Sequence, residues 1–146
     1  MANPRQITRS NGSDRPTVLV VEDVVLVRML LADVLRERGF EVIEASTAED
    51  AVRVLNADFP VRVVLSDVYM PGSGMDGVGL ARWVHEHRPG LKVILGSGVV
   101  STLDAADSAF FEGPLLQKPY KRDELERRVR AALGESESPD TDTPQR

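Results

Sequence analysis

Three acidic residues and one lysine, each placed directly after a short apolar run, are the residues of this sequence best suited to do chemistry. They are Glu22, Asp23, Asp67 and Lys118. Mg²⁺ takes oxygen ligands and is commonly bound through one or two carboxylates, and a lysine ammonium can neutralise charge on phosphoryl oxygens. These four side chains are therefore the groups that a magnesium ion and a phosphoryl group would need.

The four residues come together only if the runs before them are parallel strands of one sheet. Short apolar runs, which are typical of strands buried on both faces, precede each of them. The expected strands are 18–21, 41–45 (the weakest), 61–66, 91–95 and 115–117. The carboxyl ends of parallel strands meet at one edge of the sheet, where open α/β sheets bind their ligands. We therefore expect the three acids and the lysine to converge at that edge.

Apolar residues at helical spacing lie between the expected strands. The clearest stripe runs from Val27 to Leu35, and the fourth of five expected helices, around Leu103–Phe110, is short and poorly patterned. Ser46 with Glu49 has the spacing of a capping box, and Asp76 can cap a later helix. Strand and helix alternate five times, which predicts an α/β fold. We expect a doubly wound, flavodoxin-like, five-stranded parallel sheet of order 2-1-3-4-5 with five helices.

Composition narrows the functional classes further. The chain has 146 residues, a net charge of −5 and no cysteine, which argues against nucleic-acid binding and excludes thiolate chemistry. No apolar stretch is long enough to span a membrane, and the polar start does not resemble a signal peptide, so we expect a cytoplasmic protein. The predicted organisation is a disordered lead over 1–16, one domain over 17–134 and a disordered acidic tail over 135–146.

Five short motifs, in this order and spacing, resemble the receiver domain of bacterial response regulators in two-component signalling. They are Val-Val-Glu-Asp at 20–23, Ser-Asp-Val-Tyr-Met-Pro at 66–71, Met-Asp-Gly at 75–77, Gly-Ser-Gly at 96–98 and Lys-Pro-Tyr at 118–120. Each motif alone is weak evidence for this family, whereas the five together are strong evidence. The resemblance covers about residues 17–134, so the chain is similar to a stand-alone, single-domain receiver.

The resemblance implies a role for each residue of the cluster. Asp67 would accept a phosphoryl group, and Asp67, Asp23 and the backbone carbonyl of Tyr69 would bind Mg²⁺, with Glu22 supporting the metal. Lys118 would pair with Asp67 or its phosphoryl oxygens, and the peptide bond that follows Lys118 is usually cis in this family. Neighbouring carboxylates raise one another's pKa, so a divalent cation would keep Asp67 ionised and nucleophilic.

Three features depart from the family pattern, one of which is the longer, glycine-rich loop after Asp67, with Gly-Ser-Gly at 72–74. The hydroxyl residue expected after the strand 93–95 is replaced by Gly96, and Ser97 would have to supply the hydroxyl after a shift of one residue. The switch aromatic expected three positions before Lys118 is replaced by Leu115, which has no hydroxyl. The phosphoacceptor residues are therefore complete, whereas the residues that would report phosphorylation are altered.

These observations favour a phosphoacceptor signalling protein over an enzyme. The expected function is Mg²⁺-dependent transfer of a phosphoryl group to Asp67 from a sensor histidine kinase or a histidine phosphotransfer protein, followed by a conformational switch or onward transfer. The alternative is a degenerate receiver that binds a protein partner without phosphorylation, which Gly96 and Leu115 motivate. We expect no nucleic-acid or membrane partner, and a monomer or weak dimer.

Overall fold

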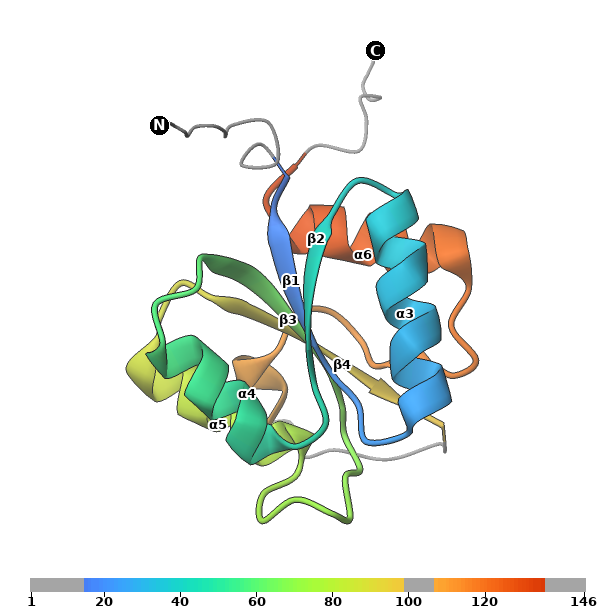
Figure 1. Ribbon diagram of the computed structural model, residues 1–146. Coiled ribbons are helices and arrows are strands. Elements are labelled where there is room, and N and C mark those ends of the chain that lie inside the picture. The colour runs from blue at the N-terminus through green and yellow to red at the C-terminus, as the bar shows by residue number, and fades with distance from the viewer. Residues whose placement is uncertain (1–14, 99–106, 136–146) are drawn as a thin grey trace, which may run out of the picture.

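The computed structural model describes residues 15–98 and 107–135, and it confirms the predicted sheet. Five parallel strands form one sheet of order β2-β1-β3-β4-β5 (Figure 1). The strands are β1 (Thr17–Val21), β2 (Glu41–Ala45), β3 (Val61–Asp67), β4 (Lys92–Ser97) and β5 (Leu116–Gln117). β3 is central and its last residue is Asp67, so the sheet carries the predicted phosphoacceptor at the end of its central strand.

Helices cover both faces of this sheet. The α-helices among the described residues are α3 (Val25–Glu37), α4 (Ala48–Asn56), α5 (Gly77–His87) and α6 (Arg122–Ala132). Helices α3 and α6 lie on one face, and α4 and α5 lie on the other (Figure 1). In place of the α-helix expected around Leu103–Phe110, the structure has a 3₁₀ helix, η2 (Asp107–Phe110); residues 103–106 lie outside the described residues.

Apolar residues of the strands alternate between two cores, one under each pair of helices. Leu19, Val64 and Leu95 pack on the α4–α5 side, whereas Leu65 and Ile94 pack on the α3–α6 side. Strands buried on both faces read as continuous apolar runs, which is the pattern that revealed them in the sequence. The sheet is therefore fixed by burial from both sides, and its carboxyl edge is held in place with it.

The helix starts show one correct and one wrong prediction from the sequence. Asp76 caps α5, with its Oδ1 accepting from the amide of Gly79 at 2.8 Å. The cap of α4 is Thr47, whose hydroxyl accepts from the amide of Asp50 at 3.0 Å, so the capping box expected from Ser46 is wrong by one residue. Two adjacent hydroxyl residues precede this helix, and spacing alone does not decide which one adopts the extended cap conformation.

The long loop that follows Asp67 is tied to the start of α4. The carboxylate of Glu49 accepts from the amide of Gly74 at 2.8 Å, and the hydroxyl of Ser73 accepts from the amide of Ala48 at 3.0 Å. The Glu49 carboxylate therefore binds the loop that follows Asp67 and does not form a capping box at the start of its own helix. These two bonds give the glycine-rich loop fixed attachment points beside the carboxyl edge of the sheet.

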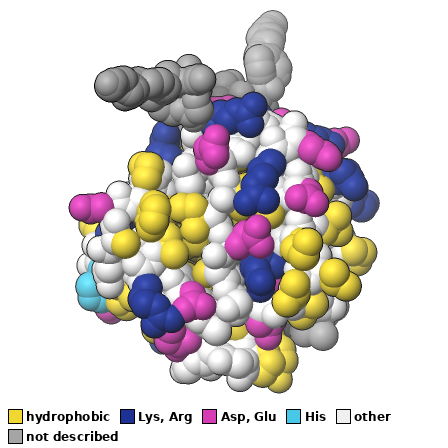
Figure 2. All heavy atoms as spheres, in the orientation of Figure 1, with side chains coloured by type: hydrophobic (Ala, Val, Ile, Leu, Met, Phe, Trp, Pro, Cys, Tyr) yellow, Lys and Arg dark blue, Asp and Glu magenta, His cyan; other side chains and the backbone are white. Residues whose placement is uncertain are grey.

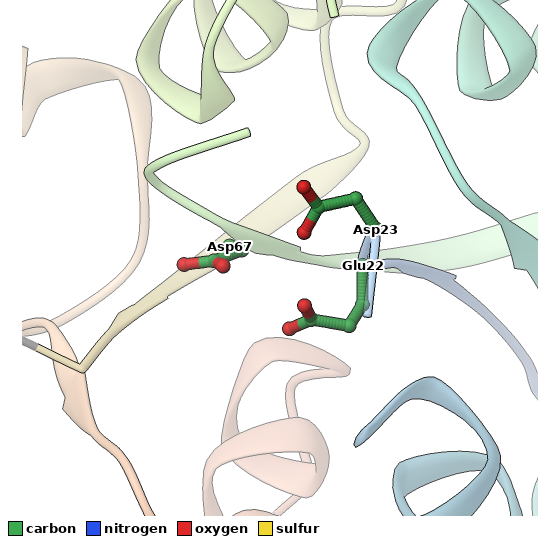
Figure 3. Close-up of side chains that lie close together, drawn as sticks. All are labelled: Glu22, Asp23 and Asp67. Atoms are coloured by element: carbon green, nitrogen blue, oxygen red, sulfur yellow. The ribbon is translucent and has the colours of Figure 1, made fainter. Parts of the chain in front are cut away.

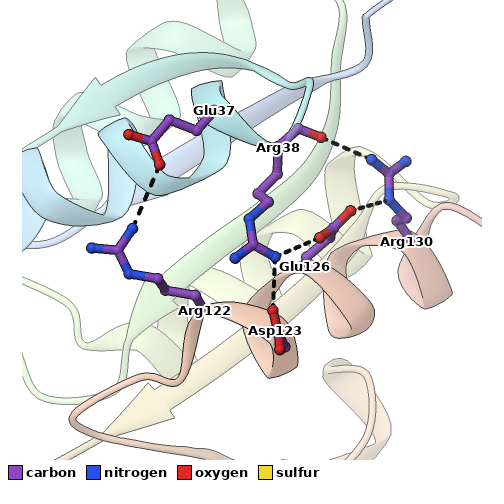
Figure 4. Close-up of polar contacts among 6 residues, drawn as sticks. All are labelled: Glu37, Arg38, Arg122, Asp123, Glu126 and Arg130. Atoms are coloured by element: carbon purple, nitrogen blue, oxygen red, sulfur yellow. Dashed lines mark hydrogen bonds and ion pairs between the residues drawn. The ribbon is translucent and has the colours of Figure 1, made fainter.

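An ion-pair network joins the end of α3 to α6 (Figure 4). The guanidinium of Arg38 donates to Glu126 at 2.7 Å and to Asp123 at 3.0 Å, and Arg130 donates to the other oxygen of Glu126 at 2.9 Å. The hydrogen bonds from Arg38 and Arg130 lower the pKa of Glu126 below its ordinary value. The network orients α6, and with it the segment between β5 and α6 that carries Lys118.

Gly77, the first residue of α5, is held directly against the backbone of Asp67. A Cβ at residue 77 would overlap the carbonyl oxygen of Asp67 and lie 2.9 Å from Cα of Val68. Gly77→Ala must therefore displace the end of β3, and we expect it to lower the free energy of unfolding by about 3 kcal/mol. Urea unfolding measures this loss.

The matched control for this substitution is Gly72→Ala in the neighbouring loop. A Cβ there meets no atom within 4 Å, so its expected change in unfolding free energy is below about 0.5 kcal/mol. Equal unfolding free energies of the two variants would show that the space beside Gly77 can accept a Cβ without displacing β3.

Candidate functional site

Asp67 lies at the carboxyl end of β3 with its side chain almost completely buried. Its exposed fraction is 8%, and its backbone pairs with Gly96 of β4. Along β3 the side chains alternate, so Asp67 shares a face with Leu65, toward α3 and α6. A buried carboxylate is costly unless it has partners. Its partners come from the ends of two other strands.

Glu22 and Asp23 follow β1, the strand next to β3, and both point toward Asp67 (Figure 3). Oxygen atoms of these three carboxylates all lie within 4.8 Å of one another. Glu22 is 1% exposed, and one of its oxygens accepts from the amide of Val24 at 3.1 Å. The residue that caps α3 is Val24, without a side-chain bond, so capping does not explain Asp23. An acidic trio of this kind is typical of a receiver Mg²⁺ site.

Lys118 supplies positive charge to the same pocket. Its Nζ donates to Oε1 of Glu22 at 2.8 Å and to Oδ2 of Asp67 at 2.9 Å. Burial lowers the pKa of Lys118, but the hydrogen bonds and charges of Glu22 and Asp67 outweigh that effect and raise the pKa above its ordinary value. The ammonium is therefore charged at neutral pH. The Lys118–Pro119 peptide bond is cis, as the family resemblance implied.

Tyr69 and Leu115, also predicted from the sequence as functional residues, lie outside the group of Glu22, Asp23, Asp67 and Lys118 side chains. Tyr69 is 69% exposed, and its amide lies 3.4 Å from Oδ1 of Asp67; the use of its carbonyl as a metal ligand stays a prediction. Leu115 directly precedes β5 and is half-buried against the α4–α5 core, and its role as a switch residue also stays a prediction.

Gly96 and Ser97 are the last two residues of β4. Gly96 is the register partner of Asp67 on the neighbouring strand. Ser97 is 2% exposed. Its use as the hydroxyl of the phosphoryl site stays a prediction.

Tyr120 belongs to this site, although the sequence reasoning did not assign it there. Its hydroxyl and ring fill the space beside Gly96, and it packs against the α3–α6 core. Burial, followed by the negative charges of Asp67 and Glu22, raises the pKa of its phenol well above the ordinary value. The only signal in the sequence was the combination of an aromatic residue after Lys118 with a glycine at the end of the preceding strand.

The sheet order, the helices on both faces and the acidic trio with its lysine define a CheY-like, flavodoxin-like α/β protein with a receiver-type pocket. Residues 18–130 match the response regulator receiver domain, and the chain belongs to that family. Its members are signalling phosphoacceptors of two-component systems rather than ordinary enzymes.

Similar proteins extend the family assignment. An NtrX-like response regulator of Rickettsia bellii is 33% identical over 110 residues, which cover 74% of this chain and 23% of that protein. This chain therefore spans less than a quarter of the length of that relative. The receiver domain of NtrX from Brucella abortus has a TM-score of 0.70 at 29% identity, covering 82% of this chain and 99% of that one. A CheY-like receiver from Methanospirillum hungatei has a TM-score of 0.71 at 25% identity, covering 82% and 94%.

None of the helices in the described part of the chain is both long and apolar enough to cross a lipid bilayer.

Proposed function

We propose that this protein accepts a phosphoryl group on Asp67, from a phosphohistidine of a partner kinase or phosphotransfer protein, in a reaction that requires Mg²⁺. The observation that carries the proposal is the convergence of Asp67, two further carboxylates and the Lys118 ammonium in one pocket. A carboxylate trio within 4.8 Å needs more positive charge than one ammonium supplies. Oxygen ligands of this kind suit a hard divalent cation.

The chemistry assigns a separate task to each group. An oxygen of Asp67 attacks phosphorus, the phosphorus–nitrogen bond of the donor breaks, and the imidazole leaves with the electron pair and takes up a proton. An acyl phosphate remains on Asp67. Lys118, already hydrogen-bonded to Asp67, can follow the developing charge onto a phosphoryl oxygen. Mg²⁺, held by Glu22, Asp23 and Asp67, would neutralise charge on the carboxylates and on the phosphoryl oxygens.

A protein donor fits the surface beside the pocket. Helix α3 starts directly after Asp23, and its first two turns expose an unusual number of apolar side chains (Figure 2). They are Val24, Val25, Leu26, Met29 and Leu30, each at least 50% exposed. Apolar patches rimmed by polar residues mark protein contacts. A partner that carries phosphohistidine to Asp67 must cover the rim of the pocket, and this patch forms part of that rim.

The test of the proposal is labelling with a small phosphoryl donor, which requires no knowledge of the natural partner. Purified protein is incubated with radiolabelled acetyl phosphate, once with Mg²⁺ and once with EDTA. We expect incorporation only with Mg²⁺, as an acyl phosphate that hydroxylamine cleaves. Borohydride reduction followed by mass spectrometry should place the label at residue 67. Incorporation that is equal in EDTA, or label at another residue, would contradict the proposal.

Gly96 favours a second candidate function, a binding module that does not depend on phosphorylation. The side chain expected at the position opposite Asp67 is missing, and a phosphoryl group on Asp67 would lack a hydrogen bond from residue 96. Failure of the protein to take up label from both acetyl phosphate and phosphorylated kinases, with its fold intact, would support this module over the phosphoacceptor.

A further inference from the structure

The guanidinium of Arg28, in the first turn of α3, joins the end of β1 to β2. Its Nη1 donates to the backbone carbonyl of Glu22 at 2.8 Å, and its Nε donates to Oε1 of Glu44 at 3.3 Å. The Arg28 side chain is 16% exposed, and Glu44 neutralises its charge. Arg28 therefore contacts the acidic pocket through a backbone carbonyl rather than through one of the three carboxylates.

The carbonyl that Arg28 binds belongs to the peptide unit between Glu22 and Asp23. On the strand side, the amide of Glu22 continues the ladder with β2 by donating to the carbonyl of Ala45 at 3.0 Å. The Glu22 carbonyl lies past the last residue of β1, and its hydrogen bond comes from Arg28 instead of from a strand. A peptide unit is planar, so fixing the direction of this carbonyl also fixes the positions of the Asp23 nitrogen and Cα.

Asp23 depends on its backbone for its position more than the other two acids do. Glu22 and Asp67 are both hydrogen-bonded by the Lys118 ammonium, whereas the described residues give the Asp23 carboxylate no hydrogen bond or ion pair. The Glu22 and Asp23 carboxylates leave the end of β1 on opposite sides, and both turn toward Asp67 (Figure 3). Repulsion among three carboxylates within 4.8 Å of one another favours an Asp23 turned away, and a fixed peptide unit opposes that movement.

We propose that Arg28 is a positioning residue for the Mg²⁺ site. By fixing the peptide unit between Glu22 and Asp23, it keeps the Asp23 carboxylate beside Asp67 before the ion binds. Groups that orient the ligands of a metal without touching it typically contribute about 10- to 100-fold to metal affinity. This inference rests on the proposed Mg²⁺-dependent function and adds to it a residue outside the four side chains of the pocket.

The experiment measures the Mg²⁺ dissociation constant by isothermal titration for wild type and Arg28→Met. We expect the variant to bind Mg²⁺ about 10- to 100-fold more weakly. Loss of a positive charge near three carboxylates would by itself strengthen the binding of a cation, so weaker binding reports the position of the ligands and not the net charge. A dissociation constant of Arg28→Met equal to or below that of wild type would overturn the proposal.

Arg36→Met is the matched control, because Arg36 lies further along the same helix and pairs with the same carboxylate. Its Nη2 donates to Oε2 of Glu44 at 3.4 Å and to the carbonyl of Val42 at 3.3 Å. The control removes an equal charge and an equivalent link between α3 and β2, without touching Glu22. We expect it to bind Mg²⁺ at least as tightly as wild type. If it weakens binding as much as Arg28→Met does, the effect belongs to the α3–β2 link in general and the proposal is wrong.

Arg28→Lys tests the two-sided contact in a variant that keeps the charge. Lysine carries one ammonium in place of a planar fork, so it cannot hold the Glu22 carbonyl and Glu44 in the same arrangement. We expect a Mg²⁺ affinity between those of wild type and Arg28→Met. An affinity of Arg28→Lys equal to that of wild type would show that the fork is not needed, and the proposal would not stand.

Labelling by acetyl phosphate separates the role of Arg28 from the proposed function. For Arg28→Met, the Mg²⁺ concentration that gives half the maximal rate should rise by the same factor as the dissociation constant. The maximal rate should stay within about twofold of wild type, because the bound ion then holds Asp23 itself. If wild type binds Mg²⁺ but takes no label, the proposed function fails and the dissociation constants still decide the role of Arg28. If wild type is labelled and Arg28→Met needs no more Mg²⁺, only the role of Arg28 fails.

Discussion

Asp67→Asn is expected to abolish incorporation of phosphate, reducing the labelling rate at least about 1000-fold. The amide that replaces the carboxylate is neutral and is not a nucleophile, while its size and shape are nearly unchanged. The substitution also removes one of the three carboxylates that lie within 4.8 Å of one another, so Mg²⁺ should bind more weakly. Isothermal titration with Mg²⁺ and labelling by acetyl phosphate measure the two effects.

The matched control is Asp76→Asn, which makes the same chemical change on an exposed residue. Asparagine is as good a helix cap as aspartate, so α5 should keep its start and the protein its stability. We expect this variant to bind Mg²⁺ and take up label like wild type. Wild-type labelling of Asp67→Asn would mean that another residue is the acceptor, and the proposed function would have to be abandoned.

Lys118→Met is expected to have the second largest effect, because it leaves two buried carboxylates without their cationic partner. Glu22 is 1% exposed and Asp67 is 8% exposed, and both are hydrogen-bonded by the Lys118 ammonium. Removing one member of a buried ion pair typically costs 3–5 kcal/mol; since Lys118 itself is partly exposed, we expect a loss of about 3 kcal/mol in EDTA. The labelling rate in Mg²⁺ should fall about 100-fold, as when a preorganised charge is lost from a reacting centre.

The loss of unfolding free energy in Lys118→Met should depend on Mg²⁺ and on pH. Without the competing ammonium, Mg²⁺ should bind more tightly to Lys118→Met and restore part of the lost stability. The pKa of Lys118 is raised by folding, so its stabilising effect is complete below the ordinary lysine pKa of about 10.4 and disappears as pH rises through the raised value. The difference in unfolding free energy between wild type and variant should therefore be constant from pH 7 to about pH 9.5 and narrow above about pH 10.5.

Lys121→Met is the control for Lys118→Met. It removes the same charge from an exposed residue three positions further along the chain, which forms no side-chain cap on α6. Its expected effects on stability and labelling are small. An unfolding free energy of Lys118→Met in EDTA equal to that of this control would show that the ammonium does not neutralise the buried pair.

The placement of the acidic pocket could be predicted from the sequence because it depends on topology. Asp67 and Glu22 each end a continuous apolar run, and parallel strands bring all such ends to one edge of the sheet. The register of the sheet then pairs Val21 with Ser66, which brings the residues after β1 beside the end of β3. The position of the pocket therefore follows from strand order and register, without knowledge of side-chain conformations.

Predictions failed or stayed open where a local pattern allowed two answers. Ser46 and Thr47 are both good caps, and the backbone selected Thr47. Around Leu103–Phe110 the apolar spacing was poor, and the described part of that segment is a 3₁₀ helix rather than an α-helix. For the cap residue of α4 and for the helix type near Phe110, the local free-energy differences between the alternatives are small. Tertiary contacts therefore decide which conformation forms.

The sequence alone determined the sheet, the edge at which chemistry can occur and the identity of the three carboxylates and the lysine, because burial of apolar runs forces their ends together. Only the tertiary structure decided that Tyr120 fills the space left by Gly96, that Glu49 holds the loop after Asp67, and that Arg38 and Arg130 orient α6. These contacts join residues 24 to 92 positions apart. The direction of a side chain across such separations depends on how neighbouring elements pack, and no local periodicity encodes it.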